Sequence, residues 1–152
     1  MLFTADMRDL LRLFDQHDVE YVLVGGFAVN YYGYVRTTQD IDLLVFPKPD
    51  NARRVMAALA DFGFGSAGIS TTLFEHEGSA VHLGAEPNRI DLLTSLKGVR
   101  NADVFEGAQE IELEGARVRI ISLEHLVVSK RASDRARDLA DAEELTKINQ
   151  TD

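Results

Sequence analysis

The sequence has 152 residues, a length that suits one domain able to bury a substantial core. Hydrophobic residues make up 45% of it, which favours a globular protein over a disordered chain, while the net charge of −9 disfavours general binding to nucleic-acid phosphates. The absence of cysteine excludes disulfides and thiolate metal sites, and no apolar run is long enough to span a membrane.

The first expected elements are a helix, a buried strand and a second, shorter helix. Thr4 can cap a helix whose apolar residues recur on one face as far as His17. Because this N-terminal segment carries acids and helical periodicity rather than the features of a secretory signal, we expect a cytoplasmic protein. The apolar run Tyr21–Val24 predicts a buried strand, and residues 27–32 predict a short helix that ends at Gly33.

The middle of the chain predicts one helix and several strands. Residues 41–46 are apolar on both faces, as in a central strand that is covered on two sides. A helix is expected over 50–62, between two prolines and a glycine. Three short strands are expected over 71–74, 80–83 and 89–93, where Gly, Pro and Asn residues mark the turns between them.

The last part of the chain predicts a hairpin and two helices. Residues 110–113 and 117–121 form the hairpin across a Glu-Gly turn. Ser122 caps a helix that runs to Arg131, and a final helix starts at Asp134. The apolar face of the final helix is expected to consist of Leu139, Ala142, Leu145 and Ile148.

No feature of the sequence divides the chain into separate domains. The sequence contains no internal repeat, no low-complexity tract and no linker long enough to divide it. We therefore expect one domain over residues 1–152, with a core over about 1–121 and C-terminal helices over 122–150.

Two adjacent glycines, Gly25 and Gly26, separate the first strand from the short helix. Backbone N–H groups at a helix start can hold phosphate oxygens, and glycine lets a ligand approach the backbone closely. The alternative is a tight strand-to-helix turn without a ligand. The pattern is neither a P-loop nor the G-x-G-x-x-G dinucleotide fingerprint.

Three aspartates stand at the starts of two expected strands. Asp40 and Asp42 are two residues apart, so both project from one face of a strand while Ile41 points into the core. Asp91 belongs to a second Ile-Asp-Leu-Leu segment, and it can face the pair if the two strands lie side by side. Such carboxylates could hold one or two Mg²⁺ ions, or leave one acid as a general base. Taken singly, each acid has the alternative role of a capping, turn or solvent-facing residue.

This combination resembles motif one of the nucleotidyltransferase superfamily, whose members have a DNA polymerase beta-like fold. The motif is Gly-Gly or Gly-Ser followed by Asp-x-Asp, and thirteen residues separate Gly26 from Asp40 here. The pattern is similar to that of a small bacterial group, the AbiEii-type toxins and minimal nucleotidyltransferases of toxin–antitoxin pairs. The matching positions are Gly25, Gly26, Ala28, Gly33, Arg36, Thr38, Asp40, Ile41 and Asp42, with Lys130, Arg137, Asp138, Leu139 and Asp141 in a C-terminal element.

The resemblance implies an α+β fold, a nucleotidyltransferase-type mixed β-sheet flanked by helices, with short C-terminal helices. It implies transfer of a nucleoside monophosphate from an NTP to a hydroxyl acceptor, with release of pyrophosphate. Asp40, Asp42 and Asp91 would be the catalytic and Mg²⁺-binding residues, and Asp91 would also activate the acceptor. The nucleotide-binding residues that it implies are Gly25, Gly26, Arg36, Thr38 and Lys130.

The cationic residues of this set have alternative structural roles. Arg36 could pair with a neighbouring acid instead of a phosphate. Lys130 begins a basic patch over residues 130–137, which could bind a small anion or form a salt-bridged solvent face. The four histidines, including His76 and His82, lack the spacing of a zinc helix and are expected to be structural or exposed.

The sequence leaves the acceptor open among a protein hydroxyl, a tRNA end and a small molecule, and the acidic charge disfavours RNA. Only about 30 residues follow the expected core, so a protein partner could supply the acceptor or be the acceptor. For the same reason, the alternative to an enzyme is a non-catalytic binding module on the same fold, such as an antitoxin or a regulatory subunit. The nucleobase of the NTP is equally undetermined.

Overall fold

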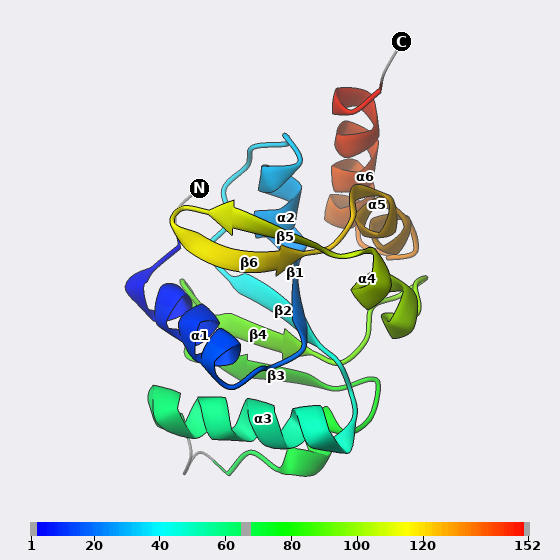
Figure 1. Cartoon of the computed structure of the whole chain (residues 1–152). Coiled ribbons are helices and arrows are strands. Elements are labelled where there is room, and N and C mark those ends of the chain that lie inside the picture. The colour runs from blue at the N-terminus through cyan, green and yellow to red at the C-terminus, as the bar shows by residue number, and fades with distance from the viewer. Residues whose placement is uncertain (1–2, 65–67, 151–152) are drawn as a thin grey trace.

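A six-stranded mixed sheet forms the centre of the fold, with helices around it (Figure 1). The structure, a computed structural model, describes residues 3–64 and 68–150. The strands are β1 (Tyr21–Val24), β2 (Ile41–Val45), β3 (Ala80–Leu83), β4 (Ile90–Leu93), β5 (Gln109–Leu113) and β6 (Ala116–Ile120). The helices are α1 (Ala5–Gln16), α2 (Gly25–Tyr31), α3 (Pro49–Leu59), α4 (Asn101–Gly107), α5 (Leu123–Arg131) and α6 (Ala136–Ile148). This architecture confirms the predicted mixed sheet flanked by helices.

The strand order is β3-β4-β2-β1-β6-β5, which places β1 and β2 in the middle. β2 is antiparallel to β1 and parallel to β4, while β1 is parallel to β6. Leu43 and Leu44 point to opposite faces of β2, yet both are fully buried. The prediction of a central strand covered on both faces is therefore confirmed.

The helices occupy two regions around the sheet. α1 and α3 lie against each other at one end, whereas α5 and α6 form a pair near the opposite end (Figure 1). The predicted cap of α1 is confirmed, because the Thr4 hydroxyl accepts a hydrogen bond from the Met7 N–H at 3.1 Å. α4 falls in a stretch for which the sequence predicted no element. No helix among residues 3–64 and 68–150 has both the length and the apolarity needed to cross a membrane.

The strand expected over 71–74 is wrong, because Thr71–Phe74 form a 3₁₀ turn. The Ser70 hydroxyl accepts a hydrogen bond from the Thr72 N–H at 3.4 Å and thereby starts the turn. Phe74 is fully buried whereas Leu73 is exposed, so one aromatic side chain anchors the segment. β-branched residues favour strands, but a nearby serine cap offers the backbone a competing local hydrogen bond.

The apolar face expected on α6 is only partly present. Ala142 and Leu145 are buried, whereas Leu139 and Ile148 are exposed. A spacing of three residues falls about 60° short of a full helical turn at each step, so these four residues sweep about half of the circumference. Only the middle two therefore face inward, and Asp141 is buried beside them.

Candidate active site

The three aspartates come together at one end of two neighbouring strands. β2 and β4 are parallel and in register, so that Asp42 lies directly beside Asp91. This confirms the strand pairing that the sequence-based site required. β3 covers the outer edge of β4, and Asp91 is only 6% exposed, so it is not a solvent-facing residue on an edge strand. Asp40 directly precedes β2 and is partly buried.

The two inner carboxylates share a strongly perturbed environment. Burial and the neighbouring charge of Asp91 raise the pKa of Asp42 to about 7, and Lys130 opposes this rise. Burial also acts to raise the pKa of Asp91, but hydrogen bonds from Arg89, His82 and Asp42 outweigh it and hold the pKa below its usual value. Because two adjacent carboxylates ionise together only at a cost, a divalent cation between them would be stabilising. Asp42 and Asp91 therefore present carboxylate oxygens of the kind that a divalent cation takes as ligands.

Asp91 is bound by two ionisable side chains, Arg89 and His82. The site predicted from the sequence did not include them. Arg89 contacts it with two nitrogens, Nε to Oδ1 at 2.7 Å and Nη2 to Oδ2 at 3.1 Å. The His82 Nδ1 lies 2.7 Å from the Asp91 Oδ1, and the His82 side chain is 52% exposed, which confirms the expectation of a structural or exposed histidine. The sequence does indicate the contact of Arg89 with Asp91, because residues two apart in a strand project from the same face. The signal for His82 lay in the β3–β4 register, which places it opposite Asp91.

The two glycines make room for side chains of the same site. Gly25 has a positive φ of 70°, and a Cβ placed on it would lie 2.8 Å from the Asp42 Cγ. A Cβ on Gly26 would lie 2.9 Å from the Thr38 Cβ. Both distances are far inside van der Waals contact, so glycine is required here for close packing against Asp42 and Thr38. The tight strand-to-helix turn of the alternative interpretation is present, and it lies beside the acids.

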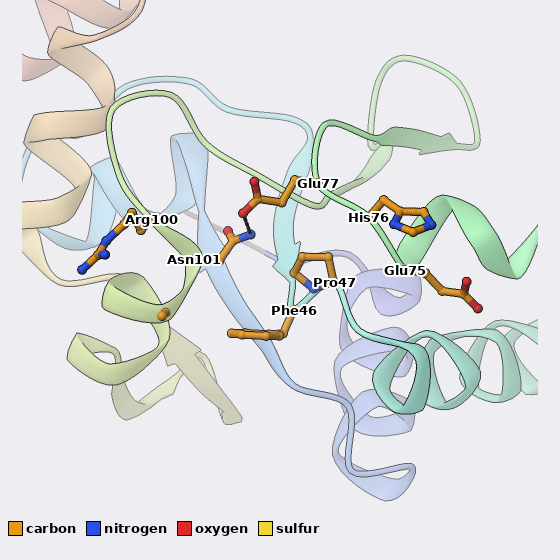
Figure 2. A pocket seen from close by; sticks show the side chains of 8 residues that line it. Phe46, Pro47, Glu75, His76, Glu77, Arg100 and Asn101 are labelled. Carbon is orange, nitrogen blue, oxygen red and sulfur yellow. Dashed lines mark hydrogen bonds between the residues drawn. The ribbon is translucent and has the colours of Figure 1, made fainter.

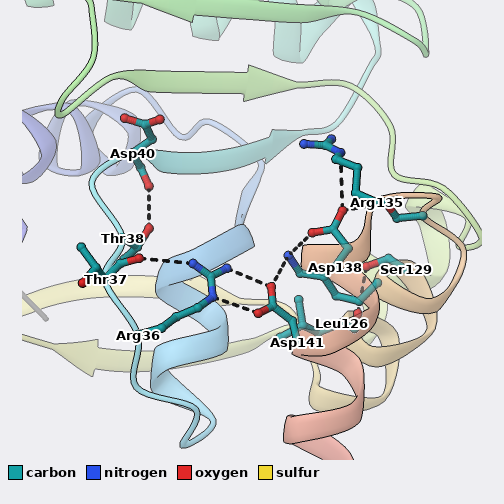
Figure 3. Close-up of polar contacts among 11 residues, drawn as sticks. Arg36, Thr37, Thr38, Asp40, Leu126, Ser129, Arg135, Asp138 and Asp141 are labelled. Atoms are coloured by element: carbon teal, nitrogen blue, oxygen red, sulfur yellow. Dashed lines mark hydrogen bonds and ion pairs between the residues drawn. The ribbon is translucent and has the colours of Figure 1, made fainter.

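A second set of charges lies between the loop before β2 and the two C-terminal helices (Figure 3). We call it the Asp141 cluster, and it consists of Arg36, Lys130, Asp138 and Asp141. Arg36 binds Asp141 through Nε and Nη2, both at 2.9 Å. Lys130 binds Asp138 at 2.9 Å and Asp141 at 3.1 Å. Arg36 is thus paired with an acid, which was the predicted alternative to binding a phosphate.

The basic patch over residues 130–137 divides into a buried and an exposed part. The Lys130 side chain is only 12% exposed, so it does not belong to a solvated face. The Arg135 side chain is 86% exposed and lies 3.6 Å from Asp138, as expected of a salt-bridged solvent face. Lys130 also lies near enough to Asp42 to lower its pKa, which connects the Asp141 cluster to the acids.

A separate cavity of about 570 Å³ lies at the other end of β2. Figure 2 shows Phe46 and Pro47 on one wall, with Glu77 bound by Asn101 at 3.1 Å. Its lining includes none of the predicted site residues. A strand rises about 3.3 Å per residue, so Phe46 is roughly 20 Å along the chain from Asp40, and this cavity is not part of the acid site.

The fold and the paired acids define the class of protein, a nucleotidyltransferase. Residues 3–151 match the family described as "Nucleotidyl transferase of unknown function (DUF2204)", and the chain belongs to that family. The predicted superfamily is therefore confirmed, while the AbiEii-type subgroup stays a prediction. No curated protein matches the sequence significantly.

Solved structures with a similar fold include an antibiotic adenylyltransferase and an antibiotic-resistance factor. The lincosamide antibiotic adenylyltransferase LnuA, with lincomycin bound, has a TM-score of 0.58 at 17% identity, over 97% of this chain and 99% of that one. The antibiotic-resistance factor ANT(2'')-Ia has a TM-score of 0.57 at 13% identity, over 93% and 81%. An antigenic nucleotidyltransferase-like protein from Paracoccidioides brasiliensis has a TM-score of 0.54 at 17% identity, over 96% and 77%. At these identities the likeness shows a shared fold.

Proposed function

We propose that this nucleotidyltransferase uses Mg²⁺ to transfer a nucleoside monophosphate from an NTP to a hydroxyl acceptor. The observation that carries the proposal is the in-register pairing of Asp42 with Asp91, where burial together with the Asp91 charge raises the pKa of Asp42 to about 7. Two carboxylates that repel each other in a partly buried site favour a divalent cation brought by a triphosphate.

Asp40, Asp42 and Asp91 are the proposed metal-binding and catalytic residues. One or two ions held there would neutralise charge on the phosphates and on the leaving pyrophosphate. Asp91 is proposed to orient and activate the acceptor hydroxyl as well. Asp40 already accepts a hydrogen bond from the Arg89 backbone N–H at 3.0 Å, which fixes the direction of its carboxylate.

Lys130 is the best supported of the proposed nucleotide ligands. Its ammonium group has three N–H donors, of which Asp138 and Asp141 take two. The third donor remains for a phosphate on the side of Asp42, whose pKa Lys130 lowers. Because both carboxylate partners hold the ammonium in place, little conformational freedom would be lost when a phosphate binds.

Gly25, Gly26, Arg36 and Thr38 complete the proposed nucleotide site. The first N–H groups of α2 have no partner within the helix, and its N-cap residue, Val24, has no side-chain acceptor to offer them. These donors suit phosphate oxygens. Arg36 and Thr38 are proposed to act mainly by ordering the loop, since Arg36 is bound to Asp141 and Thr38 packs against Gly26.

For the acceptor, the neighbouring structures favour a small molecule over a partner protein. The chain covers 99% of LnuA, an adenylyltransferase of a lincosamide antibiotic with lincomycin bound, so a chain of this size is long enough for that activity. A toxin–antitoxin role with a protein acceptor, and a non-catalytic antitoxin or regulatory module, are the alternatives. An RNA acceptor is disfavoured by the net charge of −9. We propose that residues 1–152 act as one cytoplasmic domain.

The test is transfer of label from α-phosphate-labelled NTPs to small hydroxylated molecules, proteins and tRNA in parallel, with Mg²⁺. Asp42→Asn should reduce transfer by about a thousandfold or more, because it removes a carboxylate proposed to hold the Mg²⁺ at the reacting phosphate, and the fold should remain intact by circular dichroism. Asp9→Asn, an exposed aspartate on α1, is the matched control. Transfer that survives Asp42→Asn would contradict the assignment. Calorimetry that detects no Mg²⁺-dependent NTP binding would favour the non-catalytic module.

A further inference from the structure

The guanidinium of Arg89 lies among the carboxylates at the entrance of the site. Besides its two bonds to Asp91, its Nη2 lies 3.8 Å from the Asp40 Oδ2, and its Nη1 lies 3.2 Å from the Glu86 Oε1. Its own backbone N–H holds the other oxygen of Asp40 at 3.0 Å. One residue therefore contacts two of the three proposed metal ligands.

These contacts are strong enough to compete with a metal ion. The Asp91 side chain is almost fully buried, and a bidentate arginine–carboxylate pair in such a place is a strong, directional interaction. Within the part of the chain that the structure describes, no group of three His, Asp or Glu side chains is arranged to hold a metal ion. Asp91 is instead bound through both of its oxygens to the guanidinium of Arg89.

We propose that Arg89 is the internal counter-ion of the acid site, a positioning residue that a divalent cation has to displace. The proposal rests on the proposed function, in which Asp40, Asp42 and Asp91 hold that cation. Displacement needs only a side-chain movement, because Arg89 is partly exposed and Glu86, which is exposed, keeps one of its nitrogens paired. The released guanidinium can then pair with a phosphate oxygen, for which its planar fork is suited.

The counter-ion role makes a prediction about the order of binding. A free divalent cation has to replace Arg89 at Asp91 without offering the guanidinium a new partner, so it binds weakly. A cation that arrives with a triphosphate supplies both a replacement for Arg89 at the acids and a new anionic partner for it. Metal and nucleotide therefore bind with positive cooperativity.

The experiment measures Mn²⁺ binding to the nucleotide-free protein by calorimetry at neutral pH, for wild type and two Arg89 variants. Arg89→Met should tighten Mn²⁺ binding by about tenfold or more, the scale of one charge-assisted hydrogen bond, because it removes the competing cation. Arg89→Lys keeps the charge and should stay within about threefold of the wild type. The matched control is Arg100→Met, which removes a second bidentate arginine, bound to Asp103 and outside the acid site.

Each outcome decides the proposal. Mn²⁺ binding that is unchanged or weaker in Arg89→Met overturns it, because a residue that only orients the acids would make binding worse when removed. If Arg89→Met does not fold, Arg89→Gln, which also removes the charge, takes its place, and unchanged or weaker Mn²⁺ binding in that variant overturns the proposal. NTP binding is measured in parallel on the wild type. A wild type that binds Mn²⁺ but no NTP contradicts the proposed function, while the comparison of Mn²⁺ affinities still tests the counter-ion.

Discussion

The acid site and the Asp141 cluster are two neighbouring groups of charges with opposite balance. The acid site consists of Asp40, Asp42, Glu86, Arg89 and Asp91, four carboxylates against one guanidinium, with the His82 imidazole beside Asp91. The Asp141 cluster has two carboxylates, Asp138 and Asp141, and two cations, Arg36 and Lys130. The balanced cluster positions the loop and the helices, whereas the acid site has an excess of negative charge that an external cation would neutralise.

Lys130 joins the two regions. It is bound within the Asp141 cluster, yet it also lowers the pKa of Asp42. The C-terminal helices are therefore connected to the acids through a buried charge, in addition to packing. Substitutions in one region can therefore show how far the other region depends on it.

The largest stability effect is expected inside the balanced cluster. Asp141 is 1% exposed and binds both cations, so Asp141→Ala leaves Arg36 and Lys130 without a buried partner. We expect a loss of about 3–5 kcal/mol in the free energy of unfolding, measured by urea denaturation. Glu143→Ala, which breaks an exposed pair with Lys147 on the same helix, is the control and should cost less than about 0.5 kcal/mol. A loss below about 1 kcal/mol for Asp141→Ala would show that the cluster is not structural.

An intermediate effect is expected from pH at the acid site. The pKa of Asp42 is about 7 in the folded protein and near 3.8 in the unfolded chain, so the folded state binds the extra proton. The stability that this proton contributes is fully present below about pH 4 and is lost as the pH rises through about 7. Each pKa unit corresponds to about 1.4 kcal/mol, so a rise of about three units corresponds to a loss on the order of 4 kcal/mol.

The matched comparison for this pH effect is Asp42→Asn, measured without divalent cations. The free energy of unfolding of the wild type should fall relative to the variant between pH 4 and pH 7, and the difference should be flat above pH 8. Added Mg²⁺ should reduce the fall if the acids hold the ion. Parallel pH curves for the two proteins would mean that the pKa of Asp42 is not raised in the folded protein.

The smallest effect is expected at the rim of the Asp141 cluster. Arg135 lies 3.6 Å from Asp138 and its side chain is 86% exposed. Exposed ion pairs contribute little, so Arg135→Ala should change the free energy of unfolding by less than about 0.5 kcal/mol in urea denaturation. A loss comparable to that of Asp141→Ala would mean that exposure does not distinguish Arg135 from the members of the cluster.

The sequence predicted most elements because their signals are local. The Thr4 cap, the apolar strand Tyr21–Val24 and the Ser122 cap each depend on neighbouring residues, and each is present. The prediction failed where a local signal was ambiguous, as in Thr71–Phe74. It also failed at α4, whose seven residues are too few to show a clear apolar period. The residues of the acid pair could be predicted because a strand period of two gives both the spacing of Asp40 and Asp42 and the direction of their side chains.

Most of the elements, the three candidate acids and the resemblance to the superfamily follow from local patterns in the sequence. Which charges neighbour which depends on the tertiary structure. The pairing of Asp42 with Asp91 needs the parallel register of β2 and β4, and the contact between Arg36 and Asp141 joins residues 105 positions apart. Such contacts depend on how the sheet and the C-terminal helices pack, and no periodicity encodes them. The positions of Arg89 and His82 around Asp91 have the same origin, since strand register brings them to a carboxylate that the sequence had already singled out.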